Sequence, residues 1–382
     1  MKDEGIYPQP TPQELAIRKR VRLVADQCLR PYVISDDENA FFRREAFNTL
    51  ASQGLSSISL AKEYGGQGLS YRCYFASIEE MARVSLSMAV TVGVTNLVQG
   101  ALVAFGNEKQ KQTFLFPLAK GEYLGAFSLS EPHSGSDAAA LKCQATCVEG
   151  GYLLNGIKQW CTSAGVADLY LVMARTGAHP IKGVSSFLVP KQSKGFRVGK
   201  QEDKMGLRAS PLAELIFENC FVPGQNLLGE QGKGLTVAFA QLETGRLGVA
   251  AASIGIALSA LERVWKLYKA GKIESDLLEG IRLGVASHYA SLQAVRALLG
   301  SAAELKDAKK PTVMLASSAK LLASELAMQI TSDVVSWMGC YGLLKEFEVE
   351  RLMRDAKCLQ IVEGTSQIQQ LVLAREMEGL LL

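Results

Sequence analysis

Residues 356–369 read Ala-Lys-Cys-Leu-Gln-Ile-Val-Glu-Gly-Thr-Ser-Gln-Ile-Gln, a short apolar run followed by a carboxylate and the start of a helix. Glu363 stands just before that start, and Ser366 and Gln369 have the spacing of a capping box. Exposed N–H groups at a helix N-terminus stabilise a nearby carboxylate, and they can also hold a phosphate or an oxyanion. On local sequence alone, a Glu that only complements the helix dipole is the commoner case. A chemical role for Glu363 therefore depends on the rest of the chain.

The overall composition is that of a soluble globular protein. A chain of 382 residues predicts two or three domains. It contains 48% hydrophobic and 21% charged residues, with a net charge of +3. The small positive balance argues against a dedicated nucleic-acid binder, because such proteins carry a strongly basic domain or stripe.

No segment of the sequence predicts a membrane span or a secretion signal. The longest apolar stretch, Leu247–Leu258, is well short of the roughly 20 residues that cross a bilayer. Residues 1–10 carry acidic groups and prolines without an apolar core, so they do not resemble a signal peptide. We therefore expect a cytoplasmic protein.

The eight cysteines and three histidines lack the spacing of a metal site. The cysteines form no Cys-x-x-Cys pair, so reduced structural thiols are expected. We expect no metal ion.

The order of predicted elements divides the chain into three domains of an α+β protein. Residues 1–122 predict an all-helical domain, whose first helix begins at Thr11 with Pro12 in its first turn and Glu14 as a capping-box acid. Residues 123–231 carry β-branched and aromatic runs between turns, which is typical of a β-barrel or sandwich. Residues 232–382 return to long helical patterns and predict a four-helix bundle.

Single elements can also be placed from the sequence. The Gly, Ala and Ser content of residues 248–260 predicts a buried helix whose backbone approaches its neighbours closely. The predicted helices cover residues 12–29, 41–53, 71–84, 86–105, 108–116, 235–270, 277–299, 311–338 and 367–377, and the clearest strands cover residues 169–173, 184–189 and 215–217.

Four motifs occur along the chain in a fixed order. Residues 127–137 read Phe-Ser-Leu-Ser-Glu-Pro-His-Ser-Gly-Ser-Asp, residues 154–162 read Leu-Asn-Gly-Ile-Lys-Gln-Trp-Cys-Thr, and residues 204–210 read Lys-Met-Gly-Leu-Arg-Ala-Ser. The fourth is the run from Val349 to Gln369. With the α–β–α order, they resemble the flavin-dependent acyl-CoA dehydrogenases across essentially the whole chain. One motif would be weak evidence, but four in order are strong.

The resemblance implies FAD as cofactor. Trp160 would lie beside the flavin ring, while Ser130, Thr162 and the Leu129 backbone would bond its polar edge. A core aromatic is the alternative for Trp160, and a plain helix N-cap before residues 138–140 is the alternative for Ser136 and Asp137. The cofactor-binding residues that the resemblance implies are Phe127, Leu129, Ser130, Gly135, Ser136, Trp160, Cys161, Thr162, Thr365 and Gln367.

The resemblance also implies α,β-desaturation of an acyl thioester. Glu363 would remove the α-proton while the β-hydrogen leaves as hydride to the flavin, and an electron-transfer flavoprotein would accept the electrons. Some relatives carry the base on an earlier helix, but the matching position here is Gly245, which leaves Glu363. The implied substrate-binding residues are Ser136, Glu243, Arg246 and Gly364.

At two places the sequence departs from the family pattern, which leaves the mode of FAD binding and the substrate open. Relatives carry an Arg-x-x-Phe-Gly segment where residues 271–275 read Gly-Lys-Ile-Glu-Ser, and residues 336–342 also differ. Lys272 is the nearest substitute for the missing Arg, so the hold on the adenine half of FAD is in question. A short or branched acyl-CoA is the expected substrate, and a homotetramer or dimer is the expected assembly. The alternatives are an enzyme acting on acyl-carrier protein and a non-catalytic flavoprotein that binds DNA.

Overall fold

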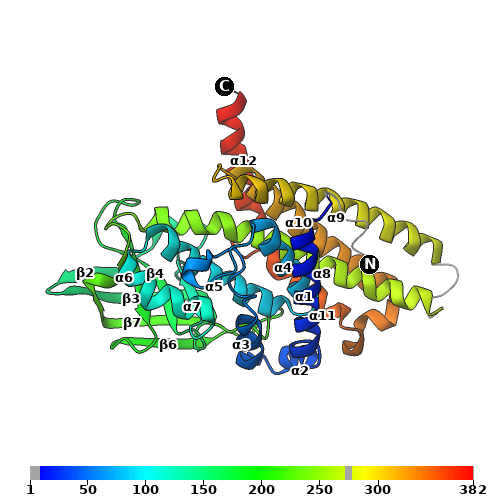
Figure 1. Ribbon diagram of the computed structural model, residues 1–382, viewed down its shortest axis with the longest axis horizontal. Helices are drawn as coiled ribbons and strands as arrows, with labels where there is room; N and C mark the ends of the chain where they lie inside the picture. Colours follow the sequence, from blue (N-terminus) through cyan, green and yellow to red (C-terminus); the bar gives the residue numbers. More distant parts are fainter. Residues whose placement is uncertain (1–8, 272–277, 382) are drawn as a thin grey trace.

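The computed structural model describes residues 9–271 and 278–381. Most of the expectation about residues 1–10, and all of that about Lys272, falls outside the described residues. Within them, the chain passes from N-terminal helices through a β-sheet to long C-terminal helices, as predicted. Figure 1 shows the sheet at one end of the molecule and the long helices at the other.

Most of the N-terminal helices form close to where the sequence predicts them, but the short helix at Val33–Glu38 was not predicted. Thr11 Oγ1 accepts a hydrogen bond from the Glu14 N–H at 3.1 Å, with Pro12 in the first turn, so the N-cap is confirmed. The Glu14 half of the capping box is wrong, because its carboxylate accepts charge-assisted bonds from Arg18 and Arg72 instead. The helices are α1 (Pro12–Cys28), α2 (Val33–Glu38), α3 (Arg44–Ser52), α4 (Tyr71–Ala82), α5 (Leu86–Phe105), α6 (Glu108–Gln110) and α7 (Phe116–Lys120).

The middle part is one eight-stranded sheet. Its main path runs β6-β7-β3-β2-β4-β5-β8, and β1 pairs in parallel with β4. The antiparallel register of β3 and β7 shifts twice, the second time between Lys158 and Cys161. Such a bulge turns side chains out of their regular alternation. The strands are β1 (Gly125–Ser128), β2 (Gln144–Val148), β3 (Gly151–Thr162), β4 (Leu169–Arg175), β5 (Val184–Pro190), β6 (Phe196–Gln201), β7 (Leu212–Pro223) and β8 (Leu227–Leu228).

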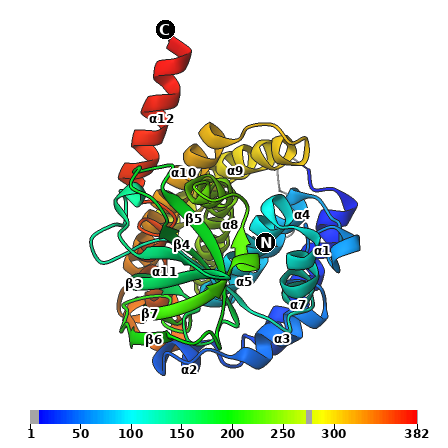
Figure 2. The same cartoon turned by 90° about the vertical axis from the view of Figure 1, so that its left-hand side faces the viewer.

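The C-terminal part is built on long helices. α8 is buried over residues 249–261, and a Cβ at Gly255 would lie 2.2 Å from the Glu79 carbonyl oxygen of α4. This approach requires glycine and confirms the predicted close-packed helix. In Figures 1 and 2, α12 projects away from the body of the protein. The helices are α8 (Gly234–Lys269), α9 (Leu278–Asp307), α10 (Val313–Trp337), α11 (Val349–Leu359) and α12 (Ser366–Leu381).

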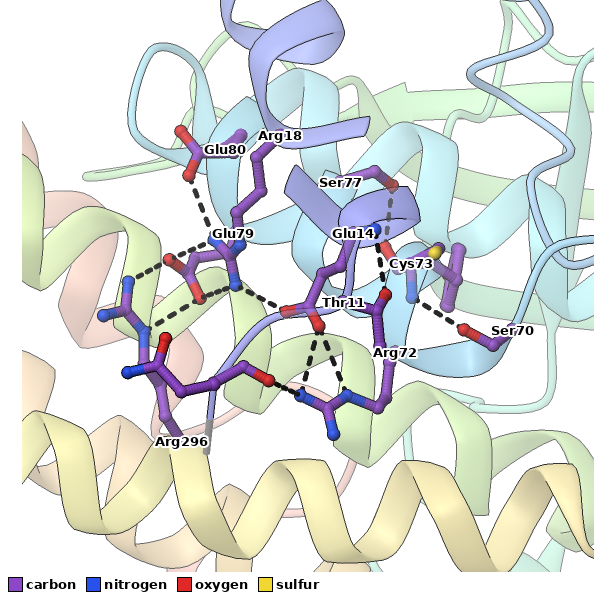
Figure 3. A network of polar contacts seen from close by, with 12 residues as sticks. Thr11, Glu14, Arg18, Ser70, Arg72, Cys73, Ser77, Glu79, Glu80 and Arg296 are labelled. Carbon is purple, nitrogen blue, oxygen red and sulfur yellow. Dashed lines mark hydrogen bonds and ion pairs between the residues drawn. The ribbon is translucent and has the colours of Figure 1, made fainter. Parts of the chain in front are cut away.

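Buried ion pairs join α1 to α4 and α9 (Figure 3). Arg18 of α1 lies 2.8 Å from Glu79 and 3.0 Å from Glu80, both of α4. Arg296 of α9 donates to the same Glu79 carboxylate at 3.2 Å. All four residues are buried. Loss of one partner would leave a buried charge uncompensated, so this network ties the N-terminal helices to the C-terminal ones.

The motif at residues 204–210 joins the sheet to α11. The Leu207 N–H donates to Asp355 Oδ1 at 2.6 Å, and Arg354 Nη1 donates to the Met205 carbonyl at 2.6 Å. A Cβ at Gly206 would lie 2.3 Å from the Arg354 carbonyl oxygen, so the motif needs its glycine for this contact.

Among the described residues, three helices have the length and apolar composition of a membrane span, namely α5, α8 and α10. In α8, 83% of the most apolar window is buried inside the protein. A helix that is apolar on all sides belongs in a core of this kind, so packing accounts for the composition of α8.

Candidate active site

Glu363 lies in the turn between α11 and α12 in an unusual backbone conformation. Its φ is 58° and that of Gly364 is 91°, so both residues are left-handed. This region costs a non-glycine residue on the order of 1 kcal/mol or more, and such residues cluster at functional sites. Buried Gln369 donates from Nε2 to the Glu363 and Gly364 carbonyl oxygens at 3.3 and 2.8 Å. The Gln369 side chain therefore stabilises the strained turn.

The predicted capping box at Ser366 and Gln369 is wrong. Thr365 caps α12, because its Oγ1 accepts from the Ile368 N–H at 3.3 Å. The Ser366 hydroxyl donates to Glu325 of α10, a partner from another helix. The predicted place of Glu363 just before the helix start is confirmed.

The Glu363 carboxylate faces α8 at Gly245. A Cβ built at Gly245 would lie 2.6 Å from Oε2 and 3.1 Å from Oε1, so only glycine leaves room for the carboxylate. Although the residue as a whole is partly exposed, Oε2 is buried and has no hydrogen-bond partner among the described residues. Burial raises the pKa of Glu363 to about 7, against the opposing charges of Arg246 and Lys320. A carboxylate with this pKa can take and return a proton near neutral pH.

Arg246 and Glu243, the predicted substrate-binding pair, lie on α8 beside Gly245. Arg246 Nη1 donates to Ser317 Oγ at 3.2 Å, while its Nε is buried without a partner in the described part of the chain. Burial lowers the pKa of Arg246, and the charges of Glu363 and Glu243 oppose that shift. Glu243 accepts a hydrogen bond from Thr312. The structure thus brings Arg246 into the electrostatic surroundings of Glu363.

The motif at residues 127–137 and the motif at residues 154–162 lie side by side at the sheet. The Gln159 N–H donates to the Ser130 carbonyl at 3.0 Å, and Cys161 Sγ lies 3.7 Å from the Phe127 carbonyl oxygen. These contacts place residues 127–130, from β1 and the loop after it, against the end of β3.

A buried ion pair, which sequence reasoning missed, holds the two motifs together. Lys158 is fully buried, and its Nζ lies 2.8 Å from Glu131 Oε1 and 2.9 Å from the Leu129 carbonyl oxygen. The Glu131 carboxylate also accepts from the backbone N–H groups of Lys142 and Cys143, at 2.6 and 2.9 Å. Glu131 belongs to the motif at residues 127–137, and Lys158 belongs to the motif at residues 154–162. The sequence signal for this ion pair was therefore an acidic and a basic residue in two motifs that were expected to meet at one site.

Trp160 is not a core aromatic. It is 52% exposed, its φ is 59°, and it lies in the second bulge of β3. An exposed tryptophan held in a strained conformation next to Ser130 is what a wall for a flat ligand requires. The core alternative for Trp160 is therefore excluded.

The remaining predicted site residues lie in the loop after β1, at the end of β3 and in the first turn of α12. Ser136 is exposed and Gly135 has open space around its Cβ position. Asp137 precedes the short 3-10 helix at residues 138–140 and makes no side-chain cap, which speaks against the plain N-cap. Thr162 is half-buried at the end of β3, and Gln367 is exposed in the first turn of α12.

Helix α5 packs against β1 of the sheet and against the part of α8 that faces Glu363. A Cβ at Gly125 of β1 would lie 3.0 Å from Val98 of α5, and one at Gly100 of α5 would lie 2.4 Å from Gln241 of α8. Gln241 lies one helical turn before Gly245. The same helix thus sets the spacing between the sheet and the Glu363 carboxylate.

The residues on the sheet fit a flavin. A flavin ring has flat apolar faces and a polar edge, so its site needs an aromatic wall, small hydroxyls and backbone donors. Trp160 offers the exposed face, and Ser130 and Thr162 are half-buried hydroxyls next to it. Together with a carboxylate that can act as a base, this site defines the class of flavin-dependent dehydrogenases.

Comparison with known proteins identifies the family. Three domain models match the chain: "Acyl-CoA dehydrogenase, N-terminal domain" over residues 11–122, the middle domain over residues 126–220 and the C-terminal domain over residues 232–378. The chain therefore belongs to the acyl-CoA dehydrogenase family.

Relatives cover almost the whole chain. It is 38% identical over 367 residues to "Acyl-CoA dehydrogenase, short-chain specific" of Clostridium acetobutylicum, which covers 95% of this chain and 97% of the relative. Butyryl-CoA dehydrogenase from Megasphaera elsdenii superposes with a TM-score of 0.94 at 35% identity, over 96% of this chain and 98% of that one. A chain from a structure described as an electron transferring flavoprotein of Acidaminococcus fermentans gives a TM-score of 0.94 at 37% identity, with the same coverage.

The protein is thus an FAD-dependent oxidoreductase that acts on a CH–CH bond of an acyl-CoA. The predicted family, fold class, cofactor and enzyme class are confirmed. The two alternatives, an enzyme acting on acyl-carrier protein and a DNA-binding flavoprotein, are not favoured by these relatives.

Proposed function

We propose that Glu363 is the general base that removes the α-proton of a short-chain acyl-CoA. The observation that carries this proposal is the buried Oε2 atom without a partner among the described residues, on a carboxyl whose pKa burial raises to about 7. A buried polar atom without a hydrogen bond is costly, and such exceptions call for an explanation. A proton-accepting role next to bound substrate supplies that explanation.

FAD, when bound, supplies the acceptor for the β-hydrogen. Trp160 would face its ring, and Ser130, Thr162 and the backbone of Leu129 would bond its polar edge. The Glu131–Lys158 pair would hold these groups in place. The further cofactor contacts that we assign by resemblance are Phe127, Gly135, Ser136, Cys161, Thr365 and Gln367.

A small acyl group is supported by the α8 face next to Glu363. Gly245 and Gly248 are three residues apart, so they lie on one face of the helix. The Tyr74 hydroxyl of α4 lies 4.0 Å from a Cβ built at Gly248, and Tyr74 is buried. An acyl chain that passes Glu363 along this face meets the Tyr74 ring, which limits its length.

The CoA part is assigned to four residues by resemblance. Arg246 offers a partly buried guanidinium whose Nε has no partner among the described residues, and Ser136 offers an exposed hydroxyl. Glu243 and Gly364 complete the set. A cytoplasmic location remains a prediction.

Two kinds of protein partner belong to this proposal. The solved structure described as an electron transferring flavoprotein supports such a protein as electron acceptor. A homo-oligomer is supported by exposed apolar side chains on the turn and on projecting α12, namely Ile361, Leu371 and Met377. Apolar groups gathered on a projecting helix mark an interaction surface.

Anaerobic bleaching of the purified yellow protein tests the function. The wild type, Glu363→Gln and the exposed control Glu149→Gln would be mixed with butyryl-, octanoyl- and palmitoyl-CoA and with a butyryl-carrier protein. Glu363→Gln should retain FAD but reduce it at least about two orders of magnitude more slowly, while Glu149→Gln behaves as wild type. Reduction of Glu363→Gln at a near wild-type rate would exclude Glu363 as the base and direct attention to Glu243.

A further inference from the structure

Helix α10 holds both ends of the turn that carries Glu363. The Gln360 carbonyl oxygen, at the start of the turn, accepts from Lys320 Nζ at 3.2 Å and from the Ser366 N–H at 3.0 Å. Glu325, further along α10, accepts from Gln360 Nε2 at 2.6 Å and from the Ser366 hydroxyl. We call Lys320 and Glu325 the α10 clamp. It closes the turn from one side, while Gln369 binds its inner carbonyl groups from the other.

Lys320 is an unusual member of this clamp. It is fully buried, yet the hydrogen bond that its ammonium group makes within the described chain is to a neutral carbonyl. An ammonium group in such surroundings is expensive unless nearby charge compensates it. Burial lowers the pKa of Lys320 to about 8, and the negative charges of Glu325 and Glu363 oppose that shift. A methionine or leucine would fill the same space without this cost.

The charged and titratable groups around Glu363 come from three helices. Arg246 of α8 and Lys320 of α10 both favour its ionised form. Tyr74 of α4 also interacts with the Glu363 carboxylate. Of the two cations, Arg246 is the one that we assign to CoA, so substrate binding engages it. Lys320 is buried, and we assign it no contact with CoA, so its charge remains near the carboxylate when substrate binds.

We propose that Lys320 is a positioning residue for the Glu363 base: through Gln360 it fixes the turn, and through its charge it favours the ionised form of the carboxylate. This inference rests on the proposed role of Glu363. It adds a residue that makes no assigned contact with substrate or FAD. Glu325 then has the complementary task of holding the turn and compensating the Lys320 charge.

The test is the pH profile of kcat/KM for flavin reduction by butyryl-CoA. Lys320→Met removes the cation, so the pKa that governs the acidic side of the profile should rise by about one unit. This is the lower end of the pKa shift that a nearby opposite charge causes in a carboxyl. Activity on the acidic side should then fall up to about tenfold, while activity at high pH returns toward wild type. Lys320→Arg keeps the charge and should keep the wild-type profile.

Two further variants separate charge from structure. Lys320→Gln retains a donor for the Gln360 carbonyl without a charge, so it should show the same shift, and it replaces Lys320→Met if that variant does not fold. Lys357→Met is the matched control, because exposed Lys357 also binds Gln360, through Oε1 at 2.8 Å. Its pH profile should be that of the wild type.

A measurement without turnover completes the design. Glu363→Gln should raise the denaturation midpoint more in a Lys320→Met background than in the wild type, because the buried carboxylate is then less compensated. The inference would be overturned if the acidic side of the pH profile stayed at the wild-type position in both Lys320→Met and Lys320→Gln, even if both variants reduce the flavin more slowly. If Glu363→Gln itself remains active, the proposed function fails instead, so the two failures are distinguishable.

Discussion

Replacing Glu363 by glutamine should stabilise the folded protein at alkaline pH while it removes the base. The substitution keeps the size and shape of the side chain, so the close contact with Gly245 is retained. Only the charge and the proton-accepting capacity are lost. A gain in stability with a loss of activity is the signature of a group kept for function at a cost to the fold.

The magnitude follows from the pKa. Burial raises the pKa of Glu363 from its ordinary value of 4.5 to about 7. Since one pH unit corresponds to about 1.4 kcal/mol, the ionised carboxylate costs the folded state about 3 kcal/mol. The residue as a whole is partly exposed, and solvent screening makes this value an upper bound.

The gain should depend on pH in one direction. Below the ordinary pKa of 4.5, the carboxyl is protonated in the folded and the unfolded protein, so glutamine brings no advantage. Between this value and about 7, the unfolded chain ionises first, and the wild type loses stability as the pH rises. The advantage of Glu363→Gln should therefore grow across this window and reach its full size above it.

Denaturant unfolding at about pH 5 and about pH 8.5, with saturating FAD, measures this advantage. Glu149→Gln serves as the control for a neutralised but exposed carboxylate. We expect a gain approaching 3 kcal/mol, within about a factor of two, at the higher pH and a small one at the lower pH. An equal gain at both pH values, or a loss at the higher one, would show that Glu363 is not held ionised at a cost.

Four other substitutions test separate parts of the protein, three at the site and one in the buried ion-pair network. Trp160→Ala should change the visible flavin spectrum and weaken FAD binding, because an exposed aromatic wall is lost; an unchanged spectrum would place the ring elsewhere. Gly245→Ala should lower kcat/KM by at least about tenfold, because its Cβ displaces the carboxylate, and wild-type kinetics would contradict that geometry. Tyr74→Ala should move the preferred chain length upward in the acyl-CoA panel, and an unchanged preference would remove Tyr74 as the limit. Arg18→Met should lower the free energy of unfolding by about 3–5 kcal/mol in denaturant titrations, and a loss below about 1 kcal/mol would mean that the buried network is not coupled.

Much of the fold follows from local patterns in the sequence. Helical periodicity and end signals place α1, α5 and α8 within a few residues, because these signals depend on neighbours in the chain. The position of Glu363 before α12 could be predicted for the same reason. The domain boundaries at residues 122/123 and 231/232 remain predictions, as do the individual site assignments.

The errors arise where a distant partner decides a local choice. Both Thr365 and Ser366 have a hydroxyl that could cap α12, and Glu325 of α10 determines which one does so by binding Ser366. Glu14 could have closed a capping box, but Arg18 and Arg72 offer charged donors. Such competition depends on tertiary contacts, which a pattern of neighbours does not contain.

Lys320 left a signal that sequence reasoning passed over. Ala316, Lys320, Ala323 and Ala327 have helical spacing, and all four are buried on one face of α10. A lysine in such a stripe is a conflict between local pattern and global burial. Conflicts of this kind are expected at functional sites, where the cost has a use.

The same argument connects the two halves of the site. Glu363 and Trp160 are both left-handed, and one keeps an unbonded buried oxygen while the other exposes half of a large ring. Each arrangement costs free energy in the protein alone, and each cost falls once a ligand covers the ring or approaches the carboxylate. The relief of these costs is contained in the affinity for each ligand, so FAD and an acyl-CoA should each raise the unfolding midpoint by mass action. If FAD at the same concentration raises the unfolding midpoint of Trp160→Ala as much as that of the wild type, FAD binding does not relieve the cost at Trp160.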